Sequence, residues 1–484
     1  MFKRYNLLLF NTIFILYLEI VFKAFIFNSV FNINTIFTVL FSLCTAFILS
    51  IIESLFGKIL NKIIMIAFSV IIWLIFTSQF IYYQYYETIF SVYSLFHGSQ
   101  VLEFINSIFT VMLNNIITII LMIIPIIFMF VYIKKIDNER KNCKFYLIVI
   151  LWILICFFGC LGLMKMLNND DTYSSYNLYY NTHVPKLTVK NLGLITEIRL
   201  DIKRTLFGFK ENIILTNSDN TILEDNTVYH IMEIDFEDLI NNETDETIKQ
   251  MDEYFSSVSP TATNEYTGMF EGKNLIYIIA EAFSPMAINE ELTPTLYKLY
   301  NEGFQFENFY TPVFYVSTSD GEYTTLTSLL PEDGVWSMSR SSDIYLPFVY
   351  GNLFKDYGYN AYAYHDGTYT YYNRDESLPN MGYTYKACYN GLNINCGMWP
   401  QSDIEMMDAT VEEYINDDNF VTYYMTISGH LEYTYNGNSI ATKNRSYVED
   451  LDYSEAIQAY LATQIELDRA ISDLIDQLDA AGKL

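Results

Sequence analysis

The chain has 484 residues, with 28 Lys and Arg against 56 Asp and Glu, and its formal net charge is −28. This length allows two or three structural units. Residues 1–166 contain 11 basic and 6 acidic residues, whereas residues 167–484 contain 17 and 50. Because nucleic-acid binding requires a basic surface, the acidic part argues against a nucleic-acid partner.

Five apolar runs follow one another in the basic front part. Each is about as long as the 17–25 residues that a membrane-spanning helix needs. Pro125 in the fourth run is tolerated in membrane helices, and Glu19 and Lys23 in the first argue against a cleaved signal peptide. We therefore predict a five-helix transmembrane bundle within residues 1–166, with helices at Leu7–Phe27, Thr35–Ile52, Ile63–Ile81, Val111–Ile133 and Phe145–Met164.

Basic residues predict the orientation of this bundle, because Lys and Arg concentrate in cytoplasmic loops. Residues 81–111 contain no Lys or Arg. The basic residues occur before the first run and after the second and the fourth: Lys3, Arg4, Lys58, Lys62, Lys134, Lys135, Arg140, Lys141 and Lys144. The pattern places the N-terminus in the cytoplasm and everything after the fifth helix outside the cell. Of the six cysteines, only Cys388 and Cys396 are then external. Their spacing alone does not decide between a disulfide across a short loop, which we favour, and two free thiols.

Residues 167–270 are polar, with stretches such as "LNNDDTYSSYN" and "NNETDET". We interpret them as an extracellular juxtamembrane connector with a helix around residues 245–255. His183 and His230 occur singly there, and a lone histidine is more often structural or solvated than a metal ligand.

Residues 271–484 alternate strand and helix patterns, which indicates an α/β domain with a parallel sheet. The run "KNLIYIIAEAF" is typical of a buried strand. A helix is expected from Thr293, with Pro294 at its first position and Gly303 at its end, followed by a strand over Phe304–Phe309. The pattern then repeats around Gly358, continues with the strand run "FVTYYMTISGH", and ends in a long amphipathic helix.

Three titratable residues follow strand runs of this domain: Glu281, His365 and His430. Since polar functional groups in such folds gather at the carboxyl ends of the strands, we expect these side chains to converge on one rim. Taken singly, the glutamate could be a partner in a helix cap and each histidine a surface residue.

The stretch "YVSTSDGEYTTLTSLLP", residues 315–331, offers seven hydroxyls before an apolar helix pattern. Ser317, Thr318 or Ser319 is expected to cap this helix. A hydroxyl at a helix N-terminus also lies at the positive end of the helix dipole, which favours a bound phosphate.

Several of these pieces together resemble the bacterial lipoteichoic acid synthase family, within the sulfatase and alkaline-phosphatase superfamily. The matching pieces span about residues 271–484: "NLIYIIAEAF", "TPTLYKLYNEGFQFENFYTP", "STSDGEY", "YHDGTYTYYNRDE" and "TISGHLEY". The five-helix anchor matches as well. The resemblance implies a five-helix transmembrane bundle followed by an extracellular α/β domain of the alkaline-phosphatase/sulfatase type, so that residues 271–484 form the catalytic domain.

The resemblance also implies roles for individual residues. Glu281 and Thr318 would bind one divalent ion, Mn²⁺ or Mg²⁺, and Thr318 would be the nucleophile. His365, Arg374 and His430 would bind the phosphoglycerol group. Tyr372 stands where the family often has a tryptophan, so an aromatic wall remains without the indole hydrogen bond.

The implied activity is transfer of glycerophosphate from phosphatidylglycerol to a growing polyglycerolphosphate (lipoteichoic acid) chain, or to its glycolipid primer, through a phospho-threonine. A phosphoethanolamine transferase or a sulfatase-type hydrolase at the cell envelope is an alternative, although the C/S-x-P-x-R motif of sulfatases is absent around Thr318. Another alternative is a non-catalytic envelope protein with a degenerate metal site.

One feature departs from the family pattern. The family's metal site needs an Asp-His pair on a strand after the last helix, whereas this sequence ends shortly after Gly482. We therefore expect a C-terminally incomplete copy, the alternative being a shortened and inactive protein. The sequence supplies at most two of the expected metal ligands.

Overall fold

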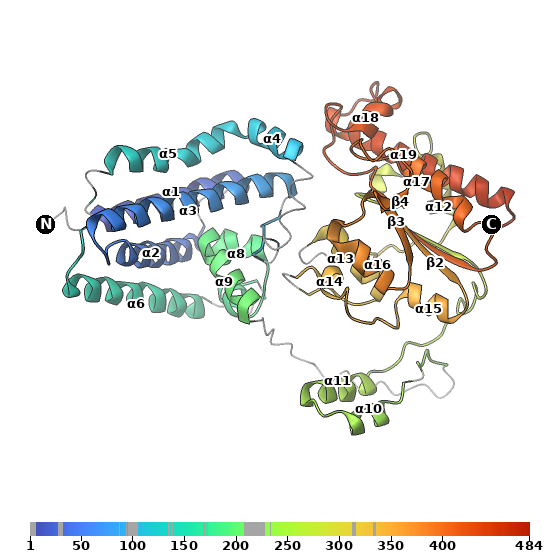
Figure 1. Ribbon diagram of the computed structural model, residues 1–484, viewed down its shortest axis with the longest axis horizontal. Coiled ribbons are helices and arrows are strands. Elements are labelled where there is room, and N and C mark those ends of the chain that lie inside the picture. Colours follow the sequence, from blue (N-terminus) through green and yellow to red (C-terminus); the bar gives the residue numbers. More distant parts are fainter. Residues whose placement is uncertain are drawn as a thin grey trace.

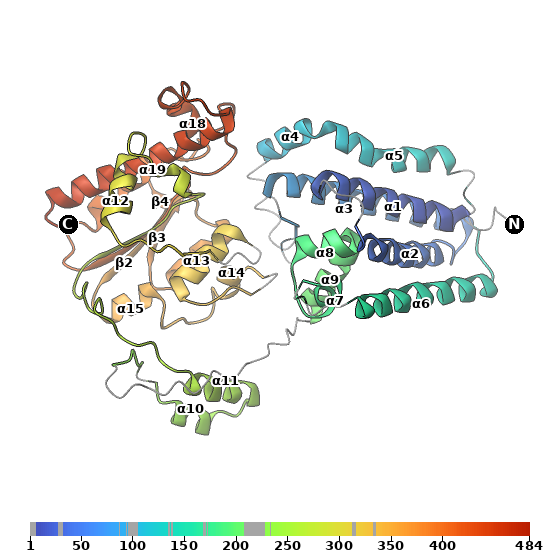
Figure 2. The same cartoon turned by 180° about the vertical axis from the view of Figure 1, so that it is seen from behind.

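The computed structural model describes residues 6–27, 32–86, 88–92, 94, 105–133, 136, 139–167, 171, 173–207, 228–232, 234–311, 316–332 and 335–484. Figure 1 shows a bundle of long helices beside an α/β domain, and Figure 2 shows the same arrangement from behind. The C-terminus lies at the end of the molecule away from the helix bundle.

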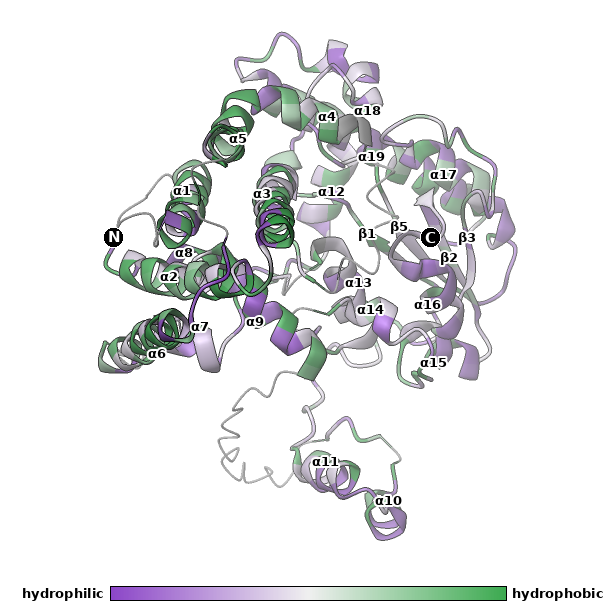
Figure 3. Cartoon of the chain, turned by 60° about the vertical axis from the view of Figure 1, so that its left-hand side comes forward, coloured by the Kyte–Doolittle hydropathy of each residue, from purple (hydrophilic) through white to green (hydrophobic). Residues whose placement is uncertain are grey.

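Six helices form the front part: α1 (Asn6–Phe27), α2 (Thr35–Ile52), α3 (Lys58–Tyr86), α4 (Ile105–Asn114), α5 (Ile116–Tyr132) and α6 (Cys143–Met166). Among the described residues, α1, α2, α3 and α6 are each long and apolar enough to cross a membrane. Their hydrophobic surfaces contrast with the more polar α/β domain in Figure 3. Large side chains pack between them, for example the rings of Phe22 and Phe76 at 5.8 Å.

The fourth apolar run differs from the single helix expected over residues 111–133. The chain bends by 82° between 108–114 and 116–132, so five spans result only if this bent pair counts as one. The break falls at Asn115, whose side-chain amide donates to the Val111 carbonyl oxygen at 3.0 Å. Asparagine side chains compete with the backbone for such carbonyls, which favours a helix break there.

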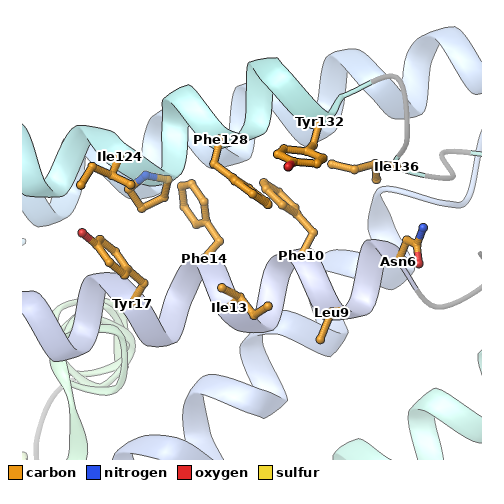
Figure 4. A pocket seen from close by; sticks show the side chains of 11 residues that line it. Asn6, Leu9, Phe10, Ile13, Phe14, Tyr17, Ile124, Phe128, Tyr132 and Ile136 are labelled. Atoms are coloured by element: carbon orange, nitrogen blue, oxygen red, sulfur yellow. The ribbon is translucent and has the colours of Figure 1, made fainter. Parts of the chain in front are cut away.

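An apolar cavity of about 410 Å³ lies between α1 and α5. Figure 4 shows Phe10 and Phe14 pointing from α1 toward Phe128 of α5. The cavity lining contains few polar side chains and no charged one, so it offers no group for chemistry.

Three shorter helices pack against the membrane helices: α7 (Ser175–Tyr180), α8 (Pro185–Leu192) and α9 (Leu194–Phe207). Glu19 of α1 accepts hydrogen bonds from the backbone N–H groups of Leu194 and Ile195, both at 3.0 Å. A carboxylate at this position satisfies the otherwise unpaired donors of the helix N-terminus. The first part of the polar connector is thus fixed to the bundle, and His183 is buried there in an ion pair with Glu197 at 3.0 Å.

The rest of the described connector contains α10 (Phe236–Asn242) and α11 (Glu246–Ser257). Neither helix has a buried residue, and both stand apart from the two larger units in Figure 1. The helix expected around residues 245–255 is confirmed, with Asp245 capping its first turn.

A five-stranded parallel sheet forms the centre of the α/β domain, in the order β1-β5-β2-β3-β4. Its strands are β1 (Leu275–Ile279), β2 (Asn360–Thr368), β3 (Thr384–Cys388), β4 (Gly391–Leu392) and β5 (Phe420–Met425). All six residues of β5 are buried, which agrees with the continuous apolar run predicted for a strand covered on both faces.

Helices cover both faces of the sheet and complete three layers (Figure 1). On one face, α12 (Pro294–Glu302), α17 (Asp403–Thr410) and α19 (Glu455–Ala480) pack on Tyr364 and Tyr424. On the other face, α13 (Ser317–Thr327), α14 (Ser337–Arg340), α15 (Tyr350–Asp356) and α16 (Arg374–Asn380) pack around Ala363 and Tyr423. The short α18 (Ser439–Lys443) packs against the first half of α19.

Three details of the domain bear on the expectations from the sequence. The strand expected over Phe304–Phe309 is wrong, because these residues form an exposed loop in which side chains such as Phe306 have no sheet to cover. The helix expected from Thr293 is confirmed, with Gly303 at its end. Cys388 and Cys396 form a disulfide, with Cα atoms 5.7 Å apart.

Candidate active site

One cavity of about 760 Å³ collects all six candidate residues from the sequence. We call it the polar cavity. Its lining includes Glu281, Thr318, His365, Tyr372, Arg374 and His430, together with Gln84, Tyr85 and Tyr86 from the end of α3. The predicted convergence at the strand ends is therefore what the fold produces.

Parallel strands bring three of these residues together. Glu281 follows β1, His365 lies within β2, and His430 follows β5, which pairs with both strands. The backbone N–H of Glu281 donates to the Thr426 hydroxyl at 3.0 Å, which fixes the chain as it leaves β1 beside β5. The site is thus built on the central strands of the sheet.

Thr318 lies in the first turn of α13. Its hydroxyl donates to the Glu281 carboxylate at 3.1 Å. The capping role expected for Thr318 or Ser319 is wrong, because the residue at the cap position is Val316, which has no side-chain oxygen and whose N–H donates to Asp320 at 2.7 Å. The side chain of Ser317, the other residue expected to cap, lies outside the described part of the structure. The Thr318 hydroxyl therefore meets Glu281 rather than its own backbone.

Arg374 is held by a buried carboxylate. Its Nε and Nη2 donate to Glu322 at distances of 2.7–3.1 Å, and both side chains are almost fully buried. The Tyr423 hydroxyl also donates to Glu322, at 2.7 Å. Burial alone would lower the pKa of Arg374, but Glu322 raises it above its ordinary value. The guanidinium fork is thus engaged by Glu322, and Nη1 is the end that faces His365.

The tautomer of His365 follows from its neighbours. Nδ1 lies 2.9 Å from the Met425 carbonyl oxygen, which only accepts, so Nδ1 carries the proton. Nε2 then accepts from Nη1 of Arg374 at 3.3 Å. Burial, with the positive charge of Arg374 beside it, holds the pKa of His365 well below its usual range. The imidazole is therefore neutral at pH 7.

Tyr372 forms an aromatic wall beside Arg374. Its ring lies 5.1 Å from the guanidinium carbon and packs edge to face on Trp336 at 5.3 Å. Tyr372 and Asn373 both adopt left-handed backbone conformations, with φ of 58° and 56°. Such a conformation costs a non-glycine residue roughly 1–2 kcal/mol, so the surrounding contacts must hold it.

His430 closes another side of the cavity. Its Nδ1 donates to the Leu431 carbonyl oxygen at 2.8 Å, and its ring packs edge to face against Trp399 at 4.9 Å. The ring of His430 thus forms part of the cavity lining.

Four residues of the site were not singled out in the sequence. Glu322 lies four residues after Thr318 in the same helix, a spacing that places both on one face and could have drawn attention to it. Gln401 lines the polar cavity, and its buried Oε1 has no hydrogen-bond partner among the described residues. Gly367 and Gly429 leave no space for a Cβ atom, because Nε2 of His365 and the carbonyl oxygen of Glu281 lie against them. No local sequence signal identifies the last three.

Two buried carboxyl groups lie under the site. Asp403 accepts from the N–H groups of Ile427 and Ser428 and from the Ser428 hydroxyl. Asp366 is fully buried, and burial together with the charge of Asp403 raises the pKa of Asp366 well above its usual range. Because Asp403 has the donors, Asp366 is the protonated partner at neutral pH.

The fit of a divalent cation rests on Glu281 and Thr318. A carboxylate and a hydroxyl 3.1 Å apart are hard oxygen ligands of the kind that Mg²⁺ and Mn²⁺ prefer. Within the described residues, no group of three or more His, Cys, Asp or Glu side chains could hold a metal ion. The pair thus fits part of a ligand set.

Comparisons with known proteins agree with this architecture. The Sulfatase family profile matches residues 273–484. Similar curated proteins include lipoteichoic acid synthase of Staphylococcus aureus, 28% identical over 235 residues, and lipoteichoic acid synthase-like YvgJ of Bacillus subtilis, 23% identical over 224 residues. Residues 273–484 therefore form a sulfatase-type domain, and this part of the chain is similar to lipoteichoic acid synthases.

The extent of this similarity is limited to the sulfatase-type domain. The two alignments include 45% and 44% of this chain and 35% of each relative, so the matched part is about a third of the relatives' length. Among solved structures, the chain is similar to the lipoteichoic acid synthase LtaP of Listeria monocytogenes, with 22% identity over 45% of this chain and 55% of that chain, and a TM-score of 0.40. The C-terminal periplasmic domain of Escherichia coli EcEptC matches with 17% identity over 44% of this chain and 60% of that chain, and a TM-score of 0.34.

Proposed function

We propose that this protein is a membrane-anchored transferase of the lipoteichoic acid synthase family. It would move a glycerophosphate group from phosphatidylglycerol to a growing polyglycerolphosphate chain or its glycolipid primer, through a phospho-threonine on Thr318. The observation that supports this most is the placement of the Thr318 hydroxyl 3.1 Å from Glu281, at a helix N-terminus, in a cavity shared with Arg374 and His430.

In the first half-reaction, the Thr318 oxygen would attack the phosphorus of the donor. The bond from phosphorus to the diacylglycerol oxygen breaks, and diacylglycerol leaves with a proton. In the second half-reaction, a hydroxyl of the acceptor attacks the phospho-threonine and restores Thr318. Glu281 is placed to receive the threonine proton.

Other groups would neutralise the charge of the transferring group. The N–H groups of the first turn of α13 can donate to phosphoryl oxygens, and His430 lines the same cavity. Arg374 contributes positive charge through Nη1, since its other donors bind Glu322. A Mn²⁺ or Mg²⁺ ion held by Glu281 and Thr318 would supply Lewis-acid chemistry, lowering the pKa of the hydroxyl.

The proposed orientation places the sulfatase-type domain outside the cell. Lys58 and Glu139 form an ion pair at 3.3 Å that joins the first residue of α3 to the segment between α5 and α6. In Figure 1 the start of α3 lies at the end of the bundle away from the α/β domain. Arg140, Lys141 and Lys144 lie in the same region of the sequence. Basic residues at that end favour the cytoplasmic side there.

The test is a headgroup-transfer assay with the full chain in lipid nanodiscs containing Mn²⁺. Phosphatidylglycerol labelled in its terminal glycerol should yield labelled glycerophosphate product and a transient mass increase on the peptide that contains Thr318. Thr318→Ala should abolish both signals, whereas Ser78→Ala, an exposed hydroxyl in α3, should not. Transfer from phosphatidylethanolamine instead, or unchanged transfer by Thr318→Ala, would contradict the proposal.

A further inference from the structure

Helix α3 reaches beyond the thickness of a bilayer. It has 29 residues, which corresponds to roughly 43 Å at 1.5 Å per residue, whereas the hydrocarbon core of a membrane measures about 30 Å. Its last turns therefore extend beyond the hydrocarbon region on the side of the sulfatase-type domain, where Gln84, Tyr85 and Tyr86 line the polar cavity.

This end of α3 packs directly on the rim of the catalytic centre. Tyr85 and Tyr86 belong to a cluster that includes Tyr371, Trp399 and Leu431 of the α/β domain. Trp399 in turn packs on His430, and Tyr371 packs on the neighbouring Tyr372 with ring centroids 4.4 Å apart. The membrane helix is thus one aromatic layer away from two candidate substrate-binding residues.

A second contact fixes the two parts to each other. The Trp336 indole N–H donates to the hydroxyl of Ser94, which follows α3 in the chain, at 3.2 Å. Trp336 also packs on Tyr372. The polar cavity therefore has two walls, one from the sulfatase-type domain and one from the membrane domain.

The membrane wall has the chemistry of a lipid–water interface. It consists of two tyrosines and one amide, and tyrosine is enriched at the level of lipid headgroups. The cavity volume of about 760 Å³ suits a drug-sized ligand, so the cavity has room for more than the phosphoryl group that would lie near Thr318. A donor that stays anchored in the bilayer must pass along this wall to bring its phosphorus to Thr318.

We propose that Gln84 and Tyr86, at the end of α3, form a subsite for the glycerol backbone and ester groups of a membrane-anchored phospholipid donor. The Gln84 amide is placed to hydrogen-bond ester oxygens, the Tyr86 hydroxyl bonds to Tyr371 and so holds its ring in place, and the tyrosine rings pack on the glycerol carbons. The inference depends on the proposed function only for the identity of the headgroup. It makes the membrane domain a part of the binding site and not only an anchor.

The test is photo-crosslinking of the full chain in phosphatidylcholine nanodiscs. The probe is a phosphatidylglycerol with a diazirine close to the carbonyl end of one acyl chain, and labelled peptides are identified by mass spectrometry. The expected result is labelling of the end of α3 and of the segment around Tyr371 or Trp399. Unlabelled phosphatidylglycerol should compete for this labelling, and additional phosphatidylcholine should not.

Near-isosteric variants make the test specific. Gln84→Leu and Tyr86→Phe should each lower the competed labelling about fivefold, the loss expected for one hydrogen bond. Tyr83→Phe is the matched control, because Tyr83 faces Phe27 and Lys186 within the bundle and is not part of the polar cavity. Labelling that is absent from α3, or unchanged in both variants, would overturn the inference.

The headgroup can be separated from the subsite in the same experiment. If a phosphatidylethanolamine probe labels the same residues and phosphatidylglycerol does not compete, the subsite is supported and the proposed phosphoglycerol donor is wrong. If a phosphatidylcholine probe labels these residues equally and no lipid competes, the subsite itself is refuted.

Discussion

The buried pair of Arg374 and Glu322 allows a quantitative prediction about stability. Both side chains have almost no exposed surface, and three contacts of 2.7–3.1 Å join them. Removing one partner leaves an uncompensated buried charge, which costs about 3–5 kcal/mol. For a domain of about 200 residues this lowers the unfolding midpoint by about 6–20 °C. We therefore expect this loss for Glu322→Leu and for Arg374→Met singly.

The double variant distinguishes the cause. Because replacing a whole buried pair with apolar residues of similar size is often nearly neutral, Glu322→Leu with Arg374→Met should recover most of the loss. The control is Glu449→Leu, which removes the exposed pair with Arg445 and should change stability by less than about 1 kcal/mol. Thermal unfolding of the full chain in detergent measures all four variants. If the two single losses add in the double variant, the buried charge is not the cause.

Three further predictions concern the neighbouring groups. Asp366 holds a proton in the folded chain because its pKa is raised, so the stability of the fold should fall as the pH rises above about 4. Asp366→Asn removes this titration and should therefore raise the unfolding midpoint, more at pH 8 than at pH 5. Gly429→Ala should push the Glu281 backbone aside and lower the free energy of unfolding by about 1–3 kcal/mol. Gly397→Ala is the control, because its methyl group meets its nearest neighbour at an ordinary 3.5 Å. The unfolding midpoints of the two variants test this prediction. Thr318→Ser should keep a measurable transfer rate and Thr318→Ala should not. The assay is product formation from labelled phosphatidylglycerol. Equal, measurable rates in both variants would exclude Thr318 as the nucleophile.

The sequence by itself determined the membrane helices and most of the sheet domain. Long apolar runs predict membrane helices and short apolar runs predict buried strands, because burial of apolar surface depends on composition over a short window. Candidate residues such as Glu281 and His430 also followed from local position, since parallel strands end at one edge. The loop over residues 304–309 was missed because its apolar side chains have no sheet to cover, so the local pattern does not decide its structure. The break at Asn115 was missed because one asparagine side chain competes with the helix backbone inside an otherwise apolar run.

Tertiary structure alone decided how the candidate side chains are engaged. The carboxylate that binds Arg374 lies 52 residues away in the chain, and no local pattern shows that Glu322 would occupy two of the guanidinium's donors. The tautomer of His365 depends on a carbonyl of β5, a different strand. The membrane wall of the polar cavity joins Gln84 to Thr318 across more than two hundred residues. Such pairings depend on how the chain packs in three dimensions. A single sequence gives no distance between residues that lie far apart along the chain.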